Sequence, residues 1–149
     1  MLTVIEKVIF LQNVDVFSDV PTEQLAYLAA IAEELNFAEG EVIYKVHEPS
    51  DALYLVLEGS VKLHIDDREI TQAGPEDAFG TWALFDDEPR VTSATVLSES
   101  RLLRIDRDDF VDLLADHIQI TQAILKSVVS RLRNLVERVG IERSTPNPQ

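Results

Sequence analysis

The first thirty-five residues carry apolar side chains at helical spacing. A short helix is predicted within residues 2–13, and residues 17–21 interrupt the pattern. We predict that Thr22 caps a second helix whose apolar stripe runs to about Leu35. The apolar positions are Val4, Ile5, Val8, Ile9 and Leu11 in the first helix, and Leu25, Leu28, Ala29 and Ala32 in the second.

From Phe37 onward the apolar residues alternate, which is typical of β-strands. Residues 53–57 form a nearly continuous apolar strand, and Asp66-Asp67-Arg68 predicts a hairpin turn. Many short strands at 8–12-residue spacing favour a barrel or jelly roll. The other predicted strands cover residues 42–46, 61–65, 92–97 and 102–105, with Gly40, Gly59 and Gly74 between the runs.

The C-terminal third returns to helical spacing. A helix is predicted over residues 106–115, with Phe110, Leu113 and Leu114 facing inward. A long helix is predicted over residues 117–139, ending at Gly140, and residues 144–149 are expected to form a disordered tail.

The long helix carries two apolar stripes. One stripe, Ile120, Ile124, Val128 and Leu135, is expected to pack on the domain. The other follows a heptad seam and predicts a parallel homodimer; the alternative is one wide stripe buried within a single monomer. The seam residues are Ile118, Leu125, Val129, Leu132, Val136 and Val139, with Gln122 as the polar member.

Composition and charge exclude several classes. The 149 residues predict one domain, and the chain has no cysteine for disulfides, thiolate zinc sites or thiol nucleophiles. No apolar run is long enough to span a bilayer or to form a secretory signal, so we expect no membrane insertion and a cytoplasmic location. The net charge is −14, and residues 1–100 hold only five Lys or Arg against twenty Asp or Glu. Direct binding to nucleic acid is therefore not expected.

Arg90 stands out in this acidic context. It follows the segment FGTWALFDDEP at residues 79–89, where a turn with exposed amides and an arginine could hold a phosphate or carboxylate. Alternatively, Arg90 only relieves repulsion among Asp86, Asp87 and Glu88. The residues of this window do not decide between the two interpretations.

The order of motifs resembles the cyclic-nucleotide-binding domain family over residues 17–140. The resemblance is carried by Phe37, Gly40, Glu41 and Ile43, by EPSDALYLVLEGSV at residues 48–61, by FGTWAL with Pro89-Arg90, and by LLRIDRDDF at residues 102–110. The implied fold is mainly β with flanking helices: a double-stranded β-helix, or jelly roll. It implies one domain over residues 1–143, with N-terminal helices to residue 36, a β-roll over 37–105 and C-terminal helices over 106–143.

The resemblance also implies a ligand site. In the family, the arginine matched by Arg90 pairs with the cyclic phosphate, and the amide matched by Ala83 helps to hold it. The long helix resembles that of catabolite-activator-like regulators, and by spacing Leu135 and Val136 would form the helix-side lid of the pocket. The candidate ligand-binding residues are Gly80, Thr81, Trp82, Ala83, Arg90 and Val91.

Three departures bear on the ligand. Thr81 stands where the family has a glutamate that binds the ribose hydroxyl, and His47 and Ser50 stand at positions that are commonly glycine. Leu135 and Val136 are apolar where the regulators contact the base with polar residues. The helix-turn-helix that follows in those regulators does not occur within this sequence.

Other chemistries find little support. The three histidines are separated in sequence, so a cupin-like metal site is not expected, and the acidic runs match no calcium loop. His64 is interpreted as a solvated strand residue. Trp82, beside the proposed pocket, could stack on a ligand, although a core aromatic is the favoured interpretation. No catalytic motif occurs, so we predict a protein that is not an enzyme and has no metal or cofactor.

Two functions remain. The first is a regulatory sensor that binds a small anion, with cAMP or cGMP as the implied ligand, and signals through the C-terminal helix. The alternative is a degenerate domain that acts as a ligand-free dimerisation or docking module. Either is compatible with a role in a larger transporter or signalling protein.

Overall fold

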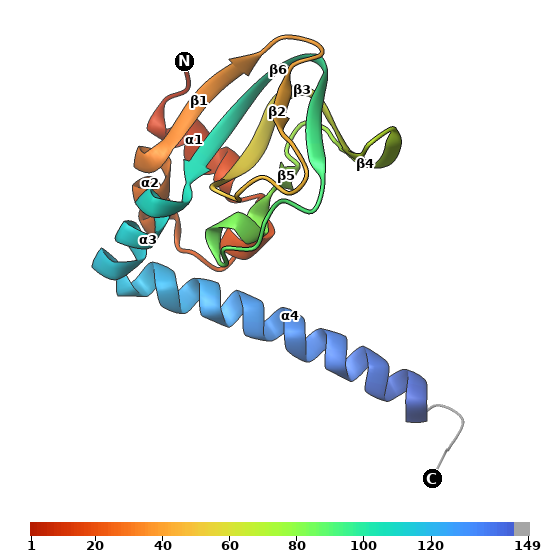
Figure 1. Cartoon of the computed structure of the whole chain (residues 1–149). Coiled ribbons are helices and arrows are strands. Elements are labelled where there is room, and N and C mark those ends of the chain that lie inside the picture. The colour runs from red at the N-terminus through yellow and green to blue at the C-terminus, as the bar shows by residue number, and fades with distance from the viewer. Residues whose placement is uncertain (145–149) are drawn as a thin grey trace.

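The computed structural model describes the backbone of residues 1–144 and the side chains of residues 1–140. Helices surround one end of a rolled antiparallel sheet, and a long C-terminal helix runs below the body and past it (Figure 1). The elements in chain order are α1 (Val4–Leu11), η1 (Asp15–Phe17), α2 (Thr22–Ile31), β1 (Ala32–Phe37), β2 (Val42–Tyr44), β3 (Ala52–Ile65), β4 (Arg68–Ala73), β5 (Ala78–Phe79), η2 (Thr81–Leu84), β6 (Ser93–Asp106), α3 (Arg107–Asp116) and α4 (Ile118–Ser144).

Two fourteen-residue strands, β3 and β6, form the spine of the sheet. They pair antiparallel along their length; β1 and β2 add to β6, and β4 and β5 add to β3. The register shifts between Val56 and Val61, where Gly59 adopts a positive φ of 96°. A Cβ on Gly59 would lie 2.2 Å from the Ser100 Oγ, so only glycine allows the strands to approach here. The mainly β, jelly-roll prediction is confirmed.

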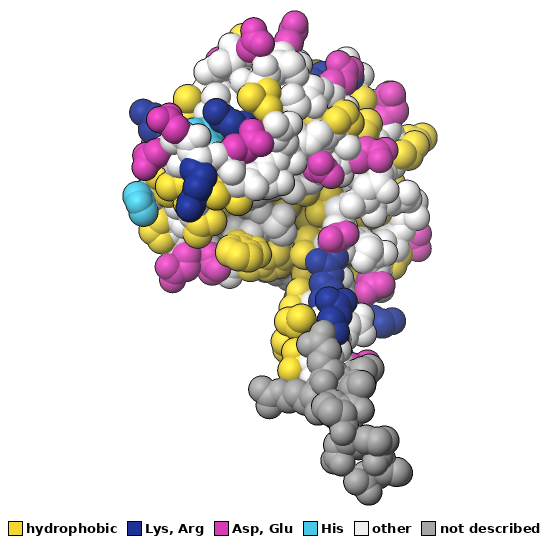
Figure 2. Space-filling model, turned by 90° about the vertical axis from the view of Figure 1, so that its right-hand side faces the viewer, with side chains coloured by type: hydrophobic (Ala, Val, Ile, Leu, Met, Phe, Trp, Pro, Cys, Tyr) yellow, Lys and Arg dark blue, Asp and Glu magenta, His cyan; other side chains and the backbone are white. Residues whose placement is uncertain are grey.

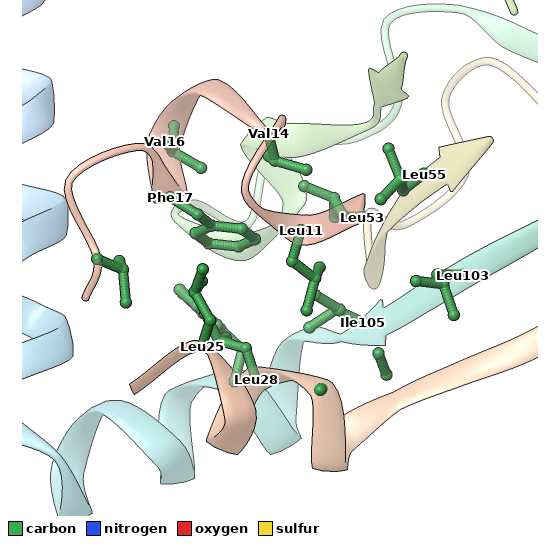
Figure 3. Close-up of a cluster of buried hydrophobic side chains, with 14 of the residues drawn as sticks. Leu11, Val14, Val16, Phe17, Leu25, Leu28, Leu53, Leu55, Leu103 and Ile105 are labelled. Atoms are coloured by element: carbon green, nitrogen blue, oxygen red, sulfur yellow. The ribbon is translucent and has the colours of Figure 1, made fainter. Parts of the chain in front are cut away.

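The apolar run at residues 53–57 is buried on both faces of β3. Leu53, Leu55 and Leu57 face the helices, whereas Tyr54 and Val56 face the interior of the roll. Figure 3 shows the helix-side cluster, in which Leu53 and Leu55 meet side chains from the N-terminal helices and from β6. Because both faces are covered, the strand is continuously apolar instead of alternating.

The N-terminal helices differ from the prediction at their ends. Thr22 is the first helical residue, and Pro21 occupies the cap position without a side-chain hydrogen bond. The second helix ends at Ile31, and the β-roll begins at Ala32, five residues before the predicted Phe37. The helix-prone sequence AEEL becomes a strand because residues 32–37 all pair with β6, and this tertiary pairing overrides local propensity.

The C-terminal half contains one strand and one helix end that differ from the prediction. The two predicted strands at residues 92–97 and 102–105 are a single strand, β6. Asp106 caps α3 by accepting hydrogen bonds from the amides of Asp108 and Asp109. Gly140 lies within α4 and does not end it, since an exposed glycine weakens a helix without terminating it. Ser144 is the last residue of α4, and the rest of the predicted tail, residues 145–149, lies outside the described residues.

Only the first part of α4 packs on the body. Ile120 and Ile124 are buried, and the Ser127 hydroxyl donates to the Asp15 carbonyl at 3.4 Å. Val128 and Leu135, predicted to continue this packed stripe, are 43% and 54% exposed. Val128 still borders a groove beside η1 and β4, and the later turns of α4 extend past the body (Figure 1). No helix within residues 1–144 has the length and hydropathy needed to cross a bilayer.

Glu34 ties the start of the chain to β1. Its Oε1 accepts a hydrogen bond from the Leu2 N–H at 2.8 Å, and its Oε2 lies 3.4 Å from the Arg101 Nη1. The Leu2 amide is the main cause that holds the pKa of Glu34 below its ordinary value of 4.5. A carboxylate with a lowered pKa stabilises the fold above its unfolded pKa, and this contribution is lost as the pH falls through the folded pKa.

We therefore expect Glu34→Gln to lower the free energy of unfolding by about 1 kcal/mol at pH 7. The difference from the native chain should shrink as the pH falls through the lowered pKa of the folded-state carboxylate. Urea unfolding at a series of pH values measures both quantities, and Glu33→Gln, at the exposed neighbouring position, is the control. A difference that stays constant from pH 7 to pH 3 would contradict the assignment.

Candidate functional site

The turn after β5 presents the candidate cassette. Gly80 has a left-handed backbone with φ of 72°, and the short helix η2 follows directly. Ala83 and Leu84 are buried and anchor η2 to the body. The Ala83 amide, implied by the resemblance as a phosphate contact, donates to the Gly80 carbonyl at 3.1 Å. A ligand oxygen would share this N–H with the turn rather than meet a free donor.

Arg90 is held from both its main chain and its side chain. Its N–H donates to the Glu48 carbonyl, and its carbonyl accepts from the His47 N–H, both at 2.8 Å. The Nη2 donates to the Ala52 carbonyl at 2.8 Å and lies 3.3 Å from the Asp51 Oδ1. The side chain is almost completely buried, so this arginine does more than relieve repulsion in the exposed acidic run at residues 86–88.

An aromatic cluster supports the guanidinium. The Arg90 Cζ lies 3.9 Å from the centroid of the Tyr44 ring, a cation–π arrangement. Tyr44 packs on Tyr54 and Phe79, and the Tyr54 and Phe79 rings are stacked with centroids 5.4 Å apart. Burial raises the pKa of Tyr44, so its hydroxyl stays neutral at physiological pH beside the arginine.

The Arg90 guanidinium does not use all of its donors within the described residues. Its Nε is buried and has no hydrogen-bond partner among the described residues. Asp51, the acidic partner of Arg90, is 63% exposed and also lies 3.4 Å from the Arg104 Nη2. A carboxylate that faces water and is shared by two arginines neutralises the buried charge only weakly. The guanidinium therefore keeps an unmet donor, although Asp86 and Glu88 also line the cavity.

All six residues predicted to bind the ligand line one cavity. It has a volume of about 310 Å³, within the range of small-molecule pockets. The sequence reasoning missed Tyr44 and Leu63, which come from strands distant in sequence, and Thr92, which directly follows Val91. The predicted residues that line the cavity are Gly80, Thr81, Trp82, Ala83, Arg90 and Val91.

Two predicted residues lie elsewhere. Leu135 and Val136, the predicted lid, are exposed on the distal part of α4 and do not line the cavity of the single chain. Only a change in the direction of α4 or a second copy could bring such residues to the cavity. The position of these residues was inferred from family spacing, which does not fix the direction of a helix.

Two side-chain environments differ from the interpretation of the sequence. Trp82 is 70% exposed at the cavity rim and is not a core residue, because η2 turns its other apolar side chains inward. His64 is half-buried, and its ring nitrogens lie 2.7 Å from the Asp66 carbonyl and 2.8 Å from the Thr95 Oγ1, so it is not merely solvated.

The backbone at His47 has the conformation that accounts for the common glycine at this position in the family. Its φ is 74°, in the left-handed region that glycine adopts most readily. The side chain is exposed, so it does not crowd the turn, and its N–H still completes the hydrogen bond to Arg90. Within residues 1–140, no group of three His, Asp or Glu side chains is arranged to hold a metal ion.

The fold and cavity define a jelly-roll domain with an arginine-centred cassette between β5 and β6. Residues 34–117 match the family model of the cyclic nucleotide-binding domain. The chain belongs to this family, as the resemblance indicated.

Three proteins of known class are similar to this chain in sequence or in structure. It is 34% identical over 128 residues to a CRP-like cAMP-activated global transcriptional regulator of Mycobacterium tuberculosis, with 83% of this chain and 57% of that protein covered. It is 31% identical to a cAMP-dependent protein kinase regulatory subunit of Dictyostelium discoideum, with 68% and 33% covered. The crystal structure of the N-terminal domain of a transcriptional regulator from Streptomyces coelicolor superposes with a TM-score of 0.80 at 33% identity, covering 87% of this chain and 94% of that domain. The chain thus spans about half or less of the two curated relatives.

The Arg90 guanidinium lies so close to Gly80 that position 80 has no room for a side chain. A Cβ on Gly80 would lie 2.6 Å from the Arg90 Nη1 and 3.2 Å from the Ala52 carbonyl oxygen. Any other residue would have to displace the guanidinium or the turn. The glycine is therefore a requirement of the arginine's position as well as of the left-handed backbone.

We expect Gly80→Ala to weaken cAMP binding by roughly tenfold or more, because the displaced guanidinium loses a charge-assisted contact of about 1.5–3 kcal/mol. Titration calorimetry of both chains with cAMP provides the measurement. Gly40→Ala is the control, because Gly40 has a φ of 88° but no atom within 4 Å of an added Cβ. Equal losses of affinity in the two variants would show that backbone strain, not contact with Arg90, is responsible.

Proposed function

We propose that this chain is a non-enzymatic sensor domain that binds a small anion at the cassette, with a cyclic nucleotide as the ligand. The observation that carries the proposal is the buried Arg90 with its unpartnered Nε. A buried donor without a partner costs about 1–3 kcal/mol, and more when it is charged. A ligand phosphate that accepts from the guanidinium would recover this cost and form the bidentate contact for which arginine is suited.

The relatives support the choice of ligand. The Mycobacterium relative is described as cAMP-activated and the Dictyostelium relative as cAMP-dependent, and both are regulatory proteins. Thr81, which lines the cavity at the position of the family glutamate, offers a shorter and uncharged contact to the ribose. We therefore expect cyclic nucleotides to bind, with an affinity about ten to one hundred times weaker than a glutamate would give.

A chain of packed side chains connects the cassette to α4. Phe85, directly after η2, meets the edge of Phe110 in α3 with ring centroids 5.7 Å apart. Phe110 in turn packs on Phe17 of η1 at 6.2 Å. Asp15, at the start of η1, accepts from Ser127 and pairs with Arg131 at 3.6 Å, and both of these residues belong to α4. A ligand that shifts η2 would therefore act on α4 through two aromatic contacts and the polar contacts of Asp15.

The exposed side of α4 supports a homodimer. All six seam residues are 43–64% exposed, although they are leucine, isoleucine or valine. Figure 2 shows hydrophobic side chains along one side of the helix where it leaves the body. A long apolar stripe at heptad spacing is more favourable when it is buried against a matching helix. Signalling would then proceed through a change in how two α4 helices pack.

We expect Arg90→Gln to weaken cAMP and cGMP binding by roughly thirtyfold or more, since the shorter amide carries no charge. Isothermal titration of the purified chain provides the measurement. Arg90→Glu is a poorer test, because it would bury a carboxylate near Asp51 and reduce stability.

Arg101→Gln is the matched control for this experiment. Arg101 is also ion-paired and also has a buried Nε without a partner, but it does not line the cavity. Equal affinity in native chain and Arg90→Gln, or no heat with either nucleotide, would count against the sensor and favour the ligand-free docking module.

We expect Leu132→Asp to weaken self-association by roughly one-hundredfold or more, because a dimer would bury two unpaired carboxylates in its seam. Leu132 is 59% exposed in the single chain, so its fold should remain intact. Sedimentation equilibrium over a concentration series gives the dissociation constant. Asn134→Asp, on the opposite side of the helix, controls for the added charge, and a native chain that is monomeric throughout would refute the dimer.

A further inference from the structure

Trp82 exposes its indole at the mouth of the Arg90 cavity. It is 70% exposed, whereas Ala83 and Leu84, which follow it in η2, are 2% and 3% exposed. Ala83 and Leu84 fix the short helix to the body, and this orientation turns the preceding indole of Trp82 outward. An aromatic side chain usually contributes by burying its faces, so an exposed indole beside a cavity has surface available for a ligand.

The other aromatic residues of the cavity have no such surface. Tyr44 and Phe79 line the same cavity but are 8% and 3% exposed. Tyr44 is covered by the Arg90 guanidinium, and Phe79 stacks on Tyr54. Within residues 1–140, Trp82 has no ring partner and no cation–π partner. It is the lining ring that remains free to stack.

The cavity also has apolar walls that a bare anion would not cover. Around the single guanidinium it is lined by Leu63, Phe79 and Val91, and its volume of about 310 Å³ leaves room beyond a phosphate group. Trp82 also borders the neighbouring groove of about 880 Å³ between η1, β4 and α4. A ring that extends from an anion bound at Arg90 would meet the indole where the two hollows join.

We propose that Trp82 is a stacking residue for a planar ring, so that the cavity selects an anion attached to an aromatic ring. This inference rests on the proposed anion site at Arg90 and names the second feature of its ligand. Stacking on an aromatic side chain tolerates different bases, since every base has a π-face. The site therefore selects nucleotides as a class and discriminates weakly between purines.

The first test compares a nucleotide with an anion that has no ring. Competition calorimetry would measure the affinity of cAMP and of ribose 5-phosphate for the native chain, Trp82→Leu and Trp82→Phe. We expect Trp82→Leu to weaken cAMP binding roughly tenfold or more, and Trp82→Phe to retain most of it. Ribose 5-phosphate should bind the native chain and Trp82→Leu equally, and cAMP and cGMP should differ by no more than about threefold.

Tyr27→Leu is the matched control, because Tyr27 is an aromatic residue that is 45% exposed but does not line the Arg90 cavity. Its affinity for cAMP should equal that of the native chain. Equal cAMP affinity in the native chain and Trp82→Leu, with binding still dependent on Arg90, would overturn the stacking inference and leave the sensor proposal standing. No binding of either anion to the native chain would overturn both.

Fluorescence supplies a second readout, because Trp82 is the sole tryptophan of the chain. We expect cAMP to quench the indole emission and to protect it from acrylamide, and ribose 5-phosphate to do neither. Emission that instead changes with protein concentration and not with cAMP would show that a second copy covers the ring, which would overturn the inference.

Discussion

The burial of one guanidinium determines how the cassette is built. Moving a charge out of water is costly, and the Ala52 carbonyl, the Asp51 carboxylate and the Tyr44 ring each offset part of that cost. Gly80 leaves the space in which the guanidinium lies, and the two backbone hydrogen bonds to residues 47 and 48 fix the chain that carries it. The compensation remains incomplete at Nε, and the proposed anionic ligand would complete it.

Both ends of the long strand β3 lie close to Arg90 or to its cavity. β3 supplies Ala52 and Tyr54 from its first part and Leu63 from its last part, and all three lie near the same cavity or guanidinium. A straight strand of fourteen residues would span about 45 Å and could not border one small cavity at both ends. The register shifts beside Gly59 therefore position the site as well as closing the roll.

The sequence predicted those parts of the site that are contiguous in the chain. Gly80 to Ala83, Arg90 and Val91 lie within one twelve-residue segment of the chain, so the spacing of the family motif identified all of them. Tyr44 and Asp51 were missed because their roles arise from strand pairing and from a loop. The start of the roll at Ala32 and the exposure of Trp82 depend on packing that local periodicity does not record. The helix predicted to end at Gly140 continues, because glycine marks an end only where the backbone leaves the helix.

The partial packing of α4 gives the domain a means of transmitting a change. A helix buried along its whole length would be fixed by the body, and a helix without contacts could not respond to it. Here Ile120, Ile124 and Ser127 hold the first turns, whereas the seam beyond them remains exposed. A small rotation imposed through Phe110 and Phe17 at the packed end becomes a larger displacement at the far end of a helix of 27 residues. Phe85, the first member of this series, directly follows the cassette helix η2, so the proposed ligand would act on α4 from the site where it binds.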